Sequence, residues 1–187
     1  MIELVDAILI APYRLTGNPV AGFYLGTLLL ALLCLFLGKA SQDLVWLWNK
    51  AHYEKEEAEM TRMHNLSVAA IEAGDKAAYK AANRQANEAF GKTFFAGAAL
   101  FSVSIWPVPF ALAWMASRFA DVAVPIFPGR AVRYNAIFLG LYILTRLGLW
   151  PLWGRLPFFG RVADRRREAA AKRPRLRRWS DLGRPEA

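Results

Sequence analysis

Two long stretches of the sequence contain no charged residue. The first has 22 residues and ends at Gly38, and the second has 25 residues and ends at Ser117. About 20 apolar helical residues cross a hydrocarbon core about 30 Å thick, so both stretches predict transmembrane helices, at 19–38 and 93–117. The second stretch contains the sequence WPVP, beginning at Trp106. Its prolines predict a kink or a break, because they lack backbone donors.

A third apolar stretch starts near Tyr134 and is uncharged as far as Thr145. Twelve residues are too few to cross a bilayer, but the segment 134–154 has 21 residues when it includes Arg146. This segment is therefore the predicted third transmembrane helix. The residues before it, 118–133, are predicted to form a short loop.

The polar segments predict helices outside the membrane. Residues 39–92 contain no proline and consist mostly of helix-forming residues. Gly74 suits the left-handed position that ends a helix, and Asp75 suits the N-cap of the next one. Two helices joined by so short a turn are antiparallel neighbours, so we expect a helical hairpin whose second arm runs into the second span. The N-terminal segment, 1–16, is predicted to form an interfacial or partly embedded helix that ends at Pro12.

Lysine and arginine outnumber the acidic residues by 24 to 15, and their distribution predicts the orientation of the chain. With three spans, the hairpin and the tail, 155–187, lie on the same side and carry 19 of the 24 basic residues. Cytoplasmic segments of membrane proteins are enriched in these residues. We therefore predict an all-α polytopic protein of the prokaryotic inner membrane. Its N-terminus lies outside, and its hairpin and C-terminus lie in the cytoplasm.

Patterns for catalysis and metal binding are missing from the sequence. Cys34 is the only cysteine, and the two histidines, His52 and His64, are twelve residues apart and fall on different faces of one helix. Neither a phosphate-binding glycine motif nor a serine–histidine pair in a suitable context occurs. The sequence predicts no enzyme, no metal, no cofactor and no small-molecule substrate.

Arg146 and the basic tail are the charged features with a functional interpretation. An ionisable residue within a span is a functional candidate by default, but an arginine there also snorkels to the interface or pairs with another subunit. The tail favours contact with anionic lipid or with ribosomal RNA, and it also acts as a simple topology signal. Its candidate contact residues are Arg165, Arg166, Arg167, Lys172, Arg173, Arg175, Arg177 and Arg178.

The order of these parts and two local sequences resemble the YidC/Oxa/Alb membrane-insertase superfamily in its minimal three-span form. That form occurs in archaeal YidC-like proteins and in the insertase subunit of the endoplasmic-reticulum membrane protein complex. APY at 11–13, followed by GFYLGTLL at 22–29, is similar to the proline-containing lead-in and first core span of the family. IEAGDKAAYKAANRQANEAFGKTFF at 71–95 is similar to the second arm of its hairpin. The similar region covers roughly residues 5–150.

The resemblance implies a groove between the spans that is wet, open to the cytoplasm and to lipid, and closed on the outside. Such a groove lets a polar segment of a client protein enter partway, which shortens its path across the hydrocarbon. Bacterial members place an arginine in the first core span. The corresponding position here is near Ala31, where the sequence is uncharged, and Arg146 could supply the charge from the third span.

Two hypotheses predict different surroundings for the polar residues of the spans. In the first, the protein is an insertase or insertion chaperone whose partners are the lipid bilayer, client membrane proteins and the ribosome. In the second, it is a non-catalytic structural or accessory subunit of a larger membrane complex, and the same residues face fixed partner subunits. The candidate groove residues are Thr27, Ser102, Ser104, Asn135, Thr145 and Arg146. On the hairpin, the candidate contacts with a client or partner are the flexible side chains of Met60 and Met63.

Overall fold

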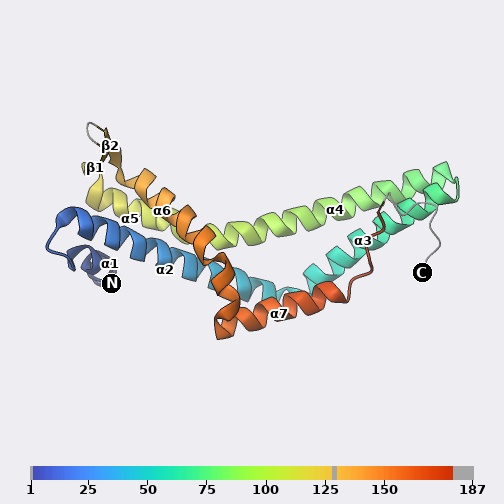
Figure 1. The fold of residues 1–187 in the computed structure, drawn as a ribbon. Helices are drawn as coiled ribbons and strands as arrows, with labels where there is room; N and C mark the ends of the chain where they lie inside the picture. Colours follow the sequence, from blue (N-terminus) through green and yellow to red (C-terminus); the bar gives the residue numbers. More distant parts are fainter. Residues whose placement is uncertain (1, 128–129, 179–187) are drawn as a thin grey trace. The chain divides into compact units, whose positions relative to one another are not determined.

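The structure, a computed structural model, describes residues 2–127 and 130–178. It is mostly helical, which supports the all-α class (Figure 1). Within the described residues, three helical segments are long and apolar enough to cross a membrane, and each contains one of the predicted spans. These segments are Pro19–Trp48, Lys76–Phe119 and Tyr134–Arg155.

The chain consists of short and long helices with one pair of strands, most of them labelled in Figure 1. In order, they are α1 (Ile2–Ile10), a 3₁₀ turn (Ala11–Arg14), α2 (Pro19–Trp48), α3 (Lys50–Glu72), α4 (Lys76–Ile105), α5 (Pro107–Phe119), β1 (Ala123–Phe127), β2 (Arg130–Arg133), α6 (Tyr134–Leu149), a second 3₁₀ turn (Trp150–Arg155) and α7 (Pro157–Ala171). The chain divides into two compact units. The first comprises Met1–Gln42 and Ser102–Leu156, and the second comprises Asp43–Phe101 and Pro157–Ala187.

The helix α2 begins at a capped N-terminus in the first unit. The side chain of Asn18 accepts hydrogen bonds from the backbone amides of Val20 and Ala21 at 2.9 and 3.2 Å. Pro19 occupies the first helical position, where the missing amide would have no partner within the helix. The local sequence therefore fixes where the first span starts.

The core of the first unit lies where α2, α5 and α6 pack together. Ala31 of α2, Met115 of α5 and Phe138 of α6 are wholly buried there. Tyr13, in the first 3₁₀ turn, packs its ring on α2, and a Cβ added at Gly26 would lie 2.4 Å from that ring. Glycine at this position leaves room for the ring, so the N-terminal segment packs directly on the first span.

The second span is interrupted at the position that the sequence predicts. The helix α4 ends at Ile105 and α5 begins at Pro107, so the proline-containing segment breaks the helix. The indole nitrogen of Trp106 donates to the hydroxyl of Ser41 at 3.1 Å. The thiol of Cys34 donates to the carbonyl of Pro107 at 3.8 Å. Two side chains of α2 thus bond with groups at the break, as expected for a helix broken by proline among neighbouring helices.

The segment 118–133, predicted as the outer loop between the second and third spans, contains a short antiparallel pair of strands. β1 pairs with β2, and Val124 lies opposite Val132. Valine, isoleucine and phenylalanine favour the pleated conformation, and a Pro-Gly sequence separates the two strands. Each strand is too short to show an alternating pattern, so the sequence alone does not reveal the pair.

The first long helix extends beyond the predicted first span. The prediction ended the span at Gly38, whereas α2 continues to Trp48. Charge ends a hydrophobic span but does not end a helix, and neither glycine nor proline occurs over 39–48. The break falls instead at Asn49, whose backbone amide and side-chain amide both donate to the carbonyl of Val45 at 3.1 Å.

In the second unit, α3 and α4 are joined by a tight turn. Gly74 has a φ of 68°, which L-residues with a side chain rarely adopt. The amides of Gly74 and Asp75 donate to the carbonyls of Ile71 and Ala70 at 3.0 Å each, which is the Schellman pattern. The carboxylate of Asp75 then accepts hydrogen bonds at 3.0 and 2.9 Å from two amides in the first turn of α4. The predicted roles of Gly74 and Asp75 are confirmed.

The helices α3 and α4 meet again away from this turn. The hydroxyl of Thr93 on α4 lies 3.5 Å from the carbonyl of Glu56 on α3. Val68 and Ser67 of α3 and Ala89 of α4 are buried in the second unit. These three buried side chains are small.

Candidate functional site

Arg146 connects two spans within the first unit. It lies in the last turn of α6, and its guanidinium is half-buried. Nη1 donates to the hydroxyl of Tyr142, one turn earlier, at 2.9 Å, and Nη2 donates to the hydroxyl of Ser104 on α4 at 3.2 Å. The guanidinium carbon also lies 6.0 Å from the centre of the Tyr142 ring. The sequence-predicted candidates Arg146 and Ser104 are therefore in contact.

A close approach of α2 holds Ser104 in this position. A Cβ added at Gly38 would lie 2.0 Å from the carbonyl oxygen of Ser104, so a residue other than glycine would force the two helices apart. Ser104 itself is buried. All three spans thus contribute to one polar cluster, which consists of Gly38, Ser104, Tyr142 and Arg146.

An apolar pocket of about 450 Å³ begins one turn farther along α6. Leu149 lines the pocket and follows Arg146 by three residues, so the two share a helix face. The volume is within the range of protein pockets that bury small apolar ligands. The lining residues are Leu32, Phe36, Leu149, Leu152, Trp153, Arg155 and Leu156.

Two of the other predicted groove residues lie far from the polar cluster. Thr27 is wholly buried, and its hydroxyl donates within its own helix to the carbonyl of Phe23 at 2.7 Å. Thr27 precedes Gly38 by eleven residues, or about 16 Å along α2. Asn135 is exposed in the first turn of α6, and it precedes Arg146 by the same number of residues. The structure therefore separates these two side chains from the cluster.

The last two predicted groove residues are close to the cluster in sequence but point elsewhere. Ser102 is exposed, and residues two apart on a helix differ in direction by about 200°. Thr145 is half-buried, and adjacent residues differ by about 100°. Of the six candidates, Ser104 and Arg146 are joined by a direct hydrogen bond, and a groove that all six share stays a prediction.

The end of α5 holds the N-terminal helix α1. Nε of Arg118 donates to Oδ1 of Asp6 at 2.9 Å, its Nη2 pairs with Oδ2, and the indole nitrogen of Trp114 donates to Oδ1 at 3.0 Å. The hydrogen bond from Arg118, followed by that from Trp114, holds the pKa of Asp6 below its ordinary value. The segment predicted to be interfacial is therefore attached to the second span.

The second unit contains a buried ion pair. Asp43 of α2 is wholly buried, and its Oδ1 accepts a hydrogen bond from Nη2 of Arg166 on α7 at 2.9 Å. The guanidinium carbon of Arg166 lies 4.8 Å from the centre of the Trp46 ring, in a cation–π contact. Burial lowers the pKa of Arg166, and the Asp43 carboxylate opposes this shift. The pair and the ring fix α7 to the end of α2.

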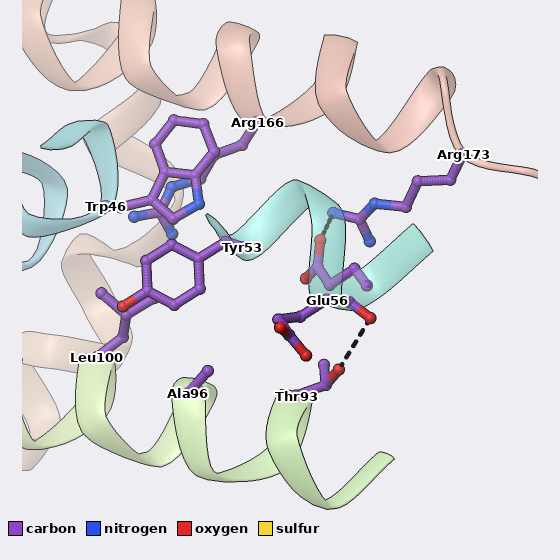
Figure 2. A pocket seen from close by; sticks show the side chains of 10 residues that line it. Trp46, Tyr53, Glu56, Thr93, Ala96, Leu100, Arg166 and Arg173 are labelled. Atoms are coloured by element: carbon purple, nitrogen blue, oxygen red, sulfur yellow. Dashed lines mark hydrogen bonds and ion pairs between the residues drawn. The ribbon is translucent and has the colours of Figure 1, made fainter. Parts of the chain in front are cut away.

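A pocket of about 170 Å³, lined by both charged and apolar residues, lies next to this ion pair. Figure 2 shows Trp46 and Tyr53 among the residues that line the pocket, with Arg173 extending toward it from the C-terminal segment. Oε2 of Glu56 and the Nε atoms of Arg166 and Arg173 are buried without a hydrogen-bond partner among the described residues. The pocket therefore offers one acceptor and two donors to water or to a ligand.

The extended segment that follows α7 runs along α3. The side chain of Asn65 donates to the carbonyl of Arg175 at 2.9 Å and accepts from the amide of Arg177 at 2.9 Å. Nη2 of Arg177 donates to both carboxylate oxygens of Glu72 at 2.9 Å, and Arg173 pairs with Glu57. The basic tail thus binds the acidic face of its own α3.

The eight predicted lipid or ribosome contacts all lie on α7 or on this extended segment. Arg166, Arg173 and Arg177 are held by carboxylates within the second unit. The exposed members are Arg165, Arg167, Lys172, Arg175 and Arg178. Contact with lipid or the ribosome stays a prediction for the whole set, and residues 179–187 of the predicted tail lie outside the described residues.

The predicted contact residues of the hairpin, Met60 and Met63, lie on α3. Both side chains are half-buried in the second unit. Each therefore retains some surface for a client or a partner, and that contact stays a prediction.

Sequence reasoning missed three residues that form these sites. Tyr142 precedes Arg146 by one helical turn. This spacing places the two side chains on one helix face and was the local signal that could have identified Tyr142. Gly38 has no local signal, because its role depends on a helix from elsewhere in the chain. Asp43 shares a helix face with Trp46, but its partner Arg166 is 123 residues away.

No family model matches the chain, and no curated protein or solved structure is significantly similar to it. Among residues 2–127 and 130–178, no three histidine, cysteine or carboxylate side chains are grouped so that they could hold a metal ion. The polar cluster and its apolar pocket are therefore the main basis for a functional proposal.

Proposed function

We propose that this protein is an insertase-like membrane protein, or an insertion chaperone, that receives client transmembrane segments in a groove open to the cytoplasm. The observation that carries the proposal is the Arg146–Ser104 contact, which holds a cation between two spans beside an apolar pocket. A client transmembrane segment combines polar flanks with apolar side chains. Arg146 offers positive charge to the flank, and the pocket offers apolar surface to the side chains.

The position of Arg146 along α6 suits this role. Arg146 follows Tyr134 by twelve residues, which is about 18 Å along the helix. In a hydrocarbon core about 30 Å thick, that distance lies past the middle, toward the side that the basic residues assign to the cytoplasm. A cation at this depth attracts acidic or polar groups that enter from the cytoplasm, and their path through hydrocarbon becomes shorter.

The proposal includes an orientation and a set of partners. The N-terminus lies outside, and the hairpin and the tail lie in the cytoplasm, because the basic residues concentrate there. The partners are the lipid bilayer, client membrane proteins and the ribosome, which the exposed arginines of α7 would contact. No covalent step is part of the proposal, because insertion moves the client into the membrane without making or breaking a covalent bond.

An insertion assay with purified protein in liposomes tests the proposal. The client is a labelled single-span protein with a short acidic N-terminal segment, and insertion is measured as protection of that segment from added protease. Arg146→Gln removes the charge and keeps a polar side chain, whereas Arg146→Lys keeps the charge. The matched control is Arg133→Gln, which removes an exposed arginine at the start of the same helix.

We expect the wild-type protein to insert more client than protein-free liposomes do. Arg146→Gln should lower insertion about tenfold, or about 1.4 kcal/mol, and Arg146→Lys should retain most of it. Arg133→Gln should behave like the wild type. Equal insertion by Arg146→Gln and the wild type contradicts the proposal, as does a wild-type protein no better than empty liposomes.

A structural subunit of a larger membrane complex is the second candidate function, and the exposed apolar surface favours it. In the most apolar 18-residue stretch of the second and third spans, 17% of the residues are buried within the protein, compared with 44% in the first span. Partner helices or lipid must cover this surface in a membrane. A native pull-down in mild detergent separates the two candidates. A complex of fixed stoichiometry that survives Arg146→Ala supports the structural subunit, whereas varied clients that disappear in Arg146→Ala support the insertase.

A further inference from the structure

We infer that the face of α3 between Glu57 and Glu72 is a binding site for an extended, arginine-rich segment of another protein. The segment Arg173–Arg177 of this chain is its intramolecular occupant. The partner is the basic cytoplasmic flank of a client transmembrane segment. In naming this partner, the inference rests on the proposed function.

The site recognises an extended backbone. Asn65 donates to the carbonyl of Arg175 and accepts from the amide of Arg177, both at 2.9 Å. Nε2 of His64 lies 3.0 Å from the carbonyl of Arg177, to which it donates. Main-chain contacts of this kind hold an extended segment whatever its side chains are. Any unfolded segment of a client has the same groups to offer.

The two carboxylates at the ends of the site select arginine. Glu72 accepts two hydrogen bonds from Arg177 at 2.9 Å, and Glu57 pairs with Arg173. Four extended residues span at most about 14 Å, whereas fifteen residues separate the two glutamates, about 22 Å along α3. The long side chains of Arg173 and Arg177 diverge and so bridge the remaining distance to the two glutamates. The planar guanidinium suits a carboxylate better than an ammonium does, so the site favours arginine at positions i and i+4.

The tail is held in a way that permits exchange. The side chains of both ion pairs are 20–33% exposed, and ion pairs in contact with water contribute little to stability. Water competes for both ion pairs, so another arginine-rich segment can replace the tail on α3.

Client transmembrane segments carry the matching chemistry. Their cytoplasmic flanks are enriched in lysine and arginine, and a flank is an unfolded chain before insertion. A flank held on α3 would stay on the cytoplasmic side while the apolar part of the client enters the groove. The site would thus contribute to the orientation of the client as well as to its capture.

A peptide-binding experiment tests the site in the full chain, held in nanodiscs of neutral phosphatidylcholine so that anionic lipid does not compete. The probe is a fluorescent peptide with the sequence of residues 171–178, AKRPRLRR, and binding is measured by anisotropy. The double variant Arg173→Ala/Arg177→Ala removes the two anchoring side chains of the tail. Its matched control, Arg165→Ala/Arg167→Ala, removes two exposed arginines of α7.

We expect the peptide to bind Arg173→Ala/Arg177→Ala about fivefold more tightly than the wild type, as two partly exposed ion pairs imply. The control should bind like the wild type. In the Arg173→Ala/Arg177→Ala background, adding Glu57→Gln/Glu72→Gln should weaken binding by at least the same factor. Equal peptide affinities of Arg173→Ala/Arg177→Ala and its control would overturn the inference. Peptide binding that does not weaken when both glutamates are replaced would overturn it as well.

Photo-crosslinking during insertion tests the partner. A photoreactive residue replaces Leu66, which is 47% exposed and adjacent to Asn65. We expect crosslinks to the arginine-rich flank of a client, and their loss when glutamine replaces those arginines. Peptide binding without such crosslinks would overturn the client as partner. Because Arg146→Gln should lower insertion but leave peptide binding unchanged, failure of this inference and failure of the proposed function remain distinguishable.

Discussion

Gly38→Ala tests the close approach of α2 and α4 that places Ser104 beside Arg146. In the structure, an added Cβ would lie 2.0 Å from the carbonyl oxygen of Ser104 and 2.9 Å from its carbonyl carbon. Real Cβ contacts are not shorter than 3.0 Å, so the two helices must separate by about 1 Å or more. The obstacle is backbone, and no side-chain rotation can relieve the clash.

The size of the effect follows from two opposing terms. Overpacking of a close helix contact costs about 1–3 kcal/mol. Alanine is favoured over glycine within a helix by about 1 kcal/mol, and this gain offsets part of that cost. Gly140→Ala is the matched control, because Gly140 lies within α6 and an added Cβ meets nothing within 4 Å there. The difference between the two variants isolates the steric cost, which we expect to be about 1–3 kcal/mol.

Thermal unfolding in mild detergent, followed by tryptophan fluorescence, measures this difference. We expect Gly38→Ala to unfold at a lower temperature than Gly140→Ala, and Gly140→Ala to be at least as stable as the wild type. Displacement of Ser104 should also weaken its hydrogen bond to Arg146, so Gly38→Ala should reduce client insertion in the liposome assay. Equal unfolding temperatures for the two variants would refute the close approach and the cluster built on it.

Three further predictions concern the other contacts. Asp75→Ala should destabilise the α3–α4 turn by about 1 kcal/mol, measured by denaturant unfolding, because two amides of α4 lose their acceptor. Arg166→Ala leaves the carboxylate of Asp43 buried without this partner and should cost about 3 kcal/mol, whereas the double variant with Asp43→Asn should recover part of that loss. The pKa of Asp6 is held low in the folded state, so its contribution to stability is present above the unfolded pKa, about 3.9, and is lost as the pH falls through the lower, folded value. Stability measured between pH 6 and pH 3 should therefore fall less in Arg118→Ala than in the wild type, and an identical pH dependence would count against this contact.

Much of the backbone could be predicted from the sequence because the signals are local. The length of an uncharged stretch predicts where a span lies, since a helix of about 20 apolar residues matches the thickness of the hydrocarbon core. Asp75 caps a helix through amides two and three residues away, and Pro107 ends one through its own missing donor. The prediction was less accurate where it used charge to end a helix at Gly38, because charge marks the limit of a span and not of a helix.

The candidate site could be predicted only in part. Arg146 was singled out because a charge within an apolar stretch is visible in the sequence. The six polar groove candidates were chosen by residue type alone, and the structure brings Ser104 to Arg146. Residue type does not tell which face a side chain occupies against a neighbouring helix, so Thr27 and Asn135 were included although they lie elsewhere.

The sequence by itself determined the three apolar helices, the break at Pro107 and the turn at Gly74, because each depends on residues a few positions apart. Only the tertiary structure decided which distant groups meet. Ser104 and Arg146 are 42 residues apart, and Asp43 and Arg166 are 123 apart. Pairings over such distances depend on how closely helices pack, on burial that makes an unpaired charge costly, and on glycine at the point of contact. These are properties of the assembled chain, and no short stretch of the sequence contains them.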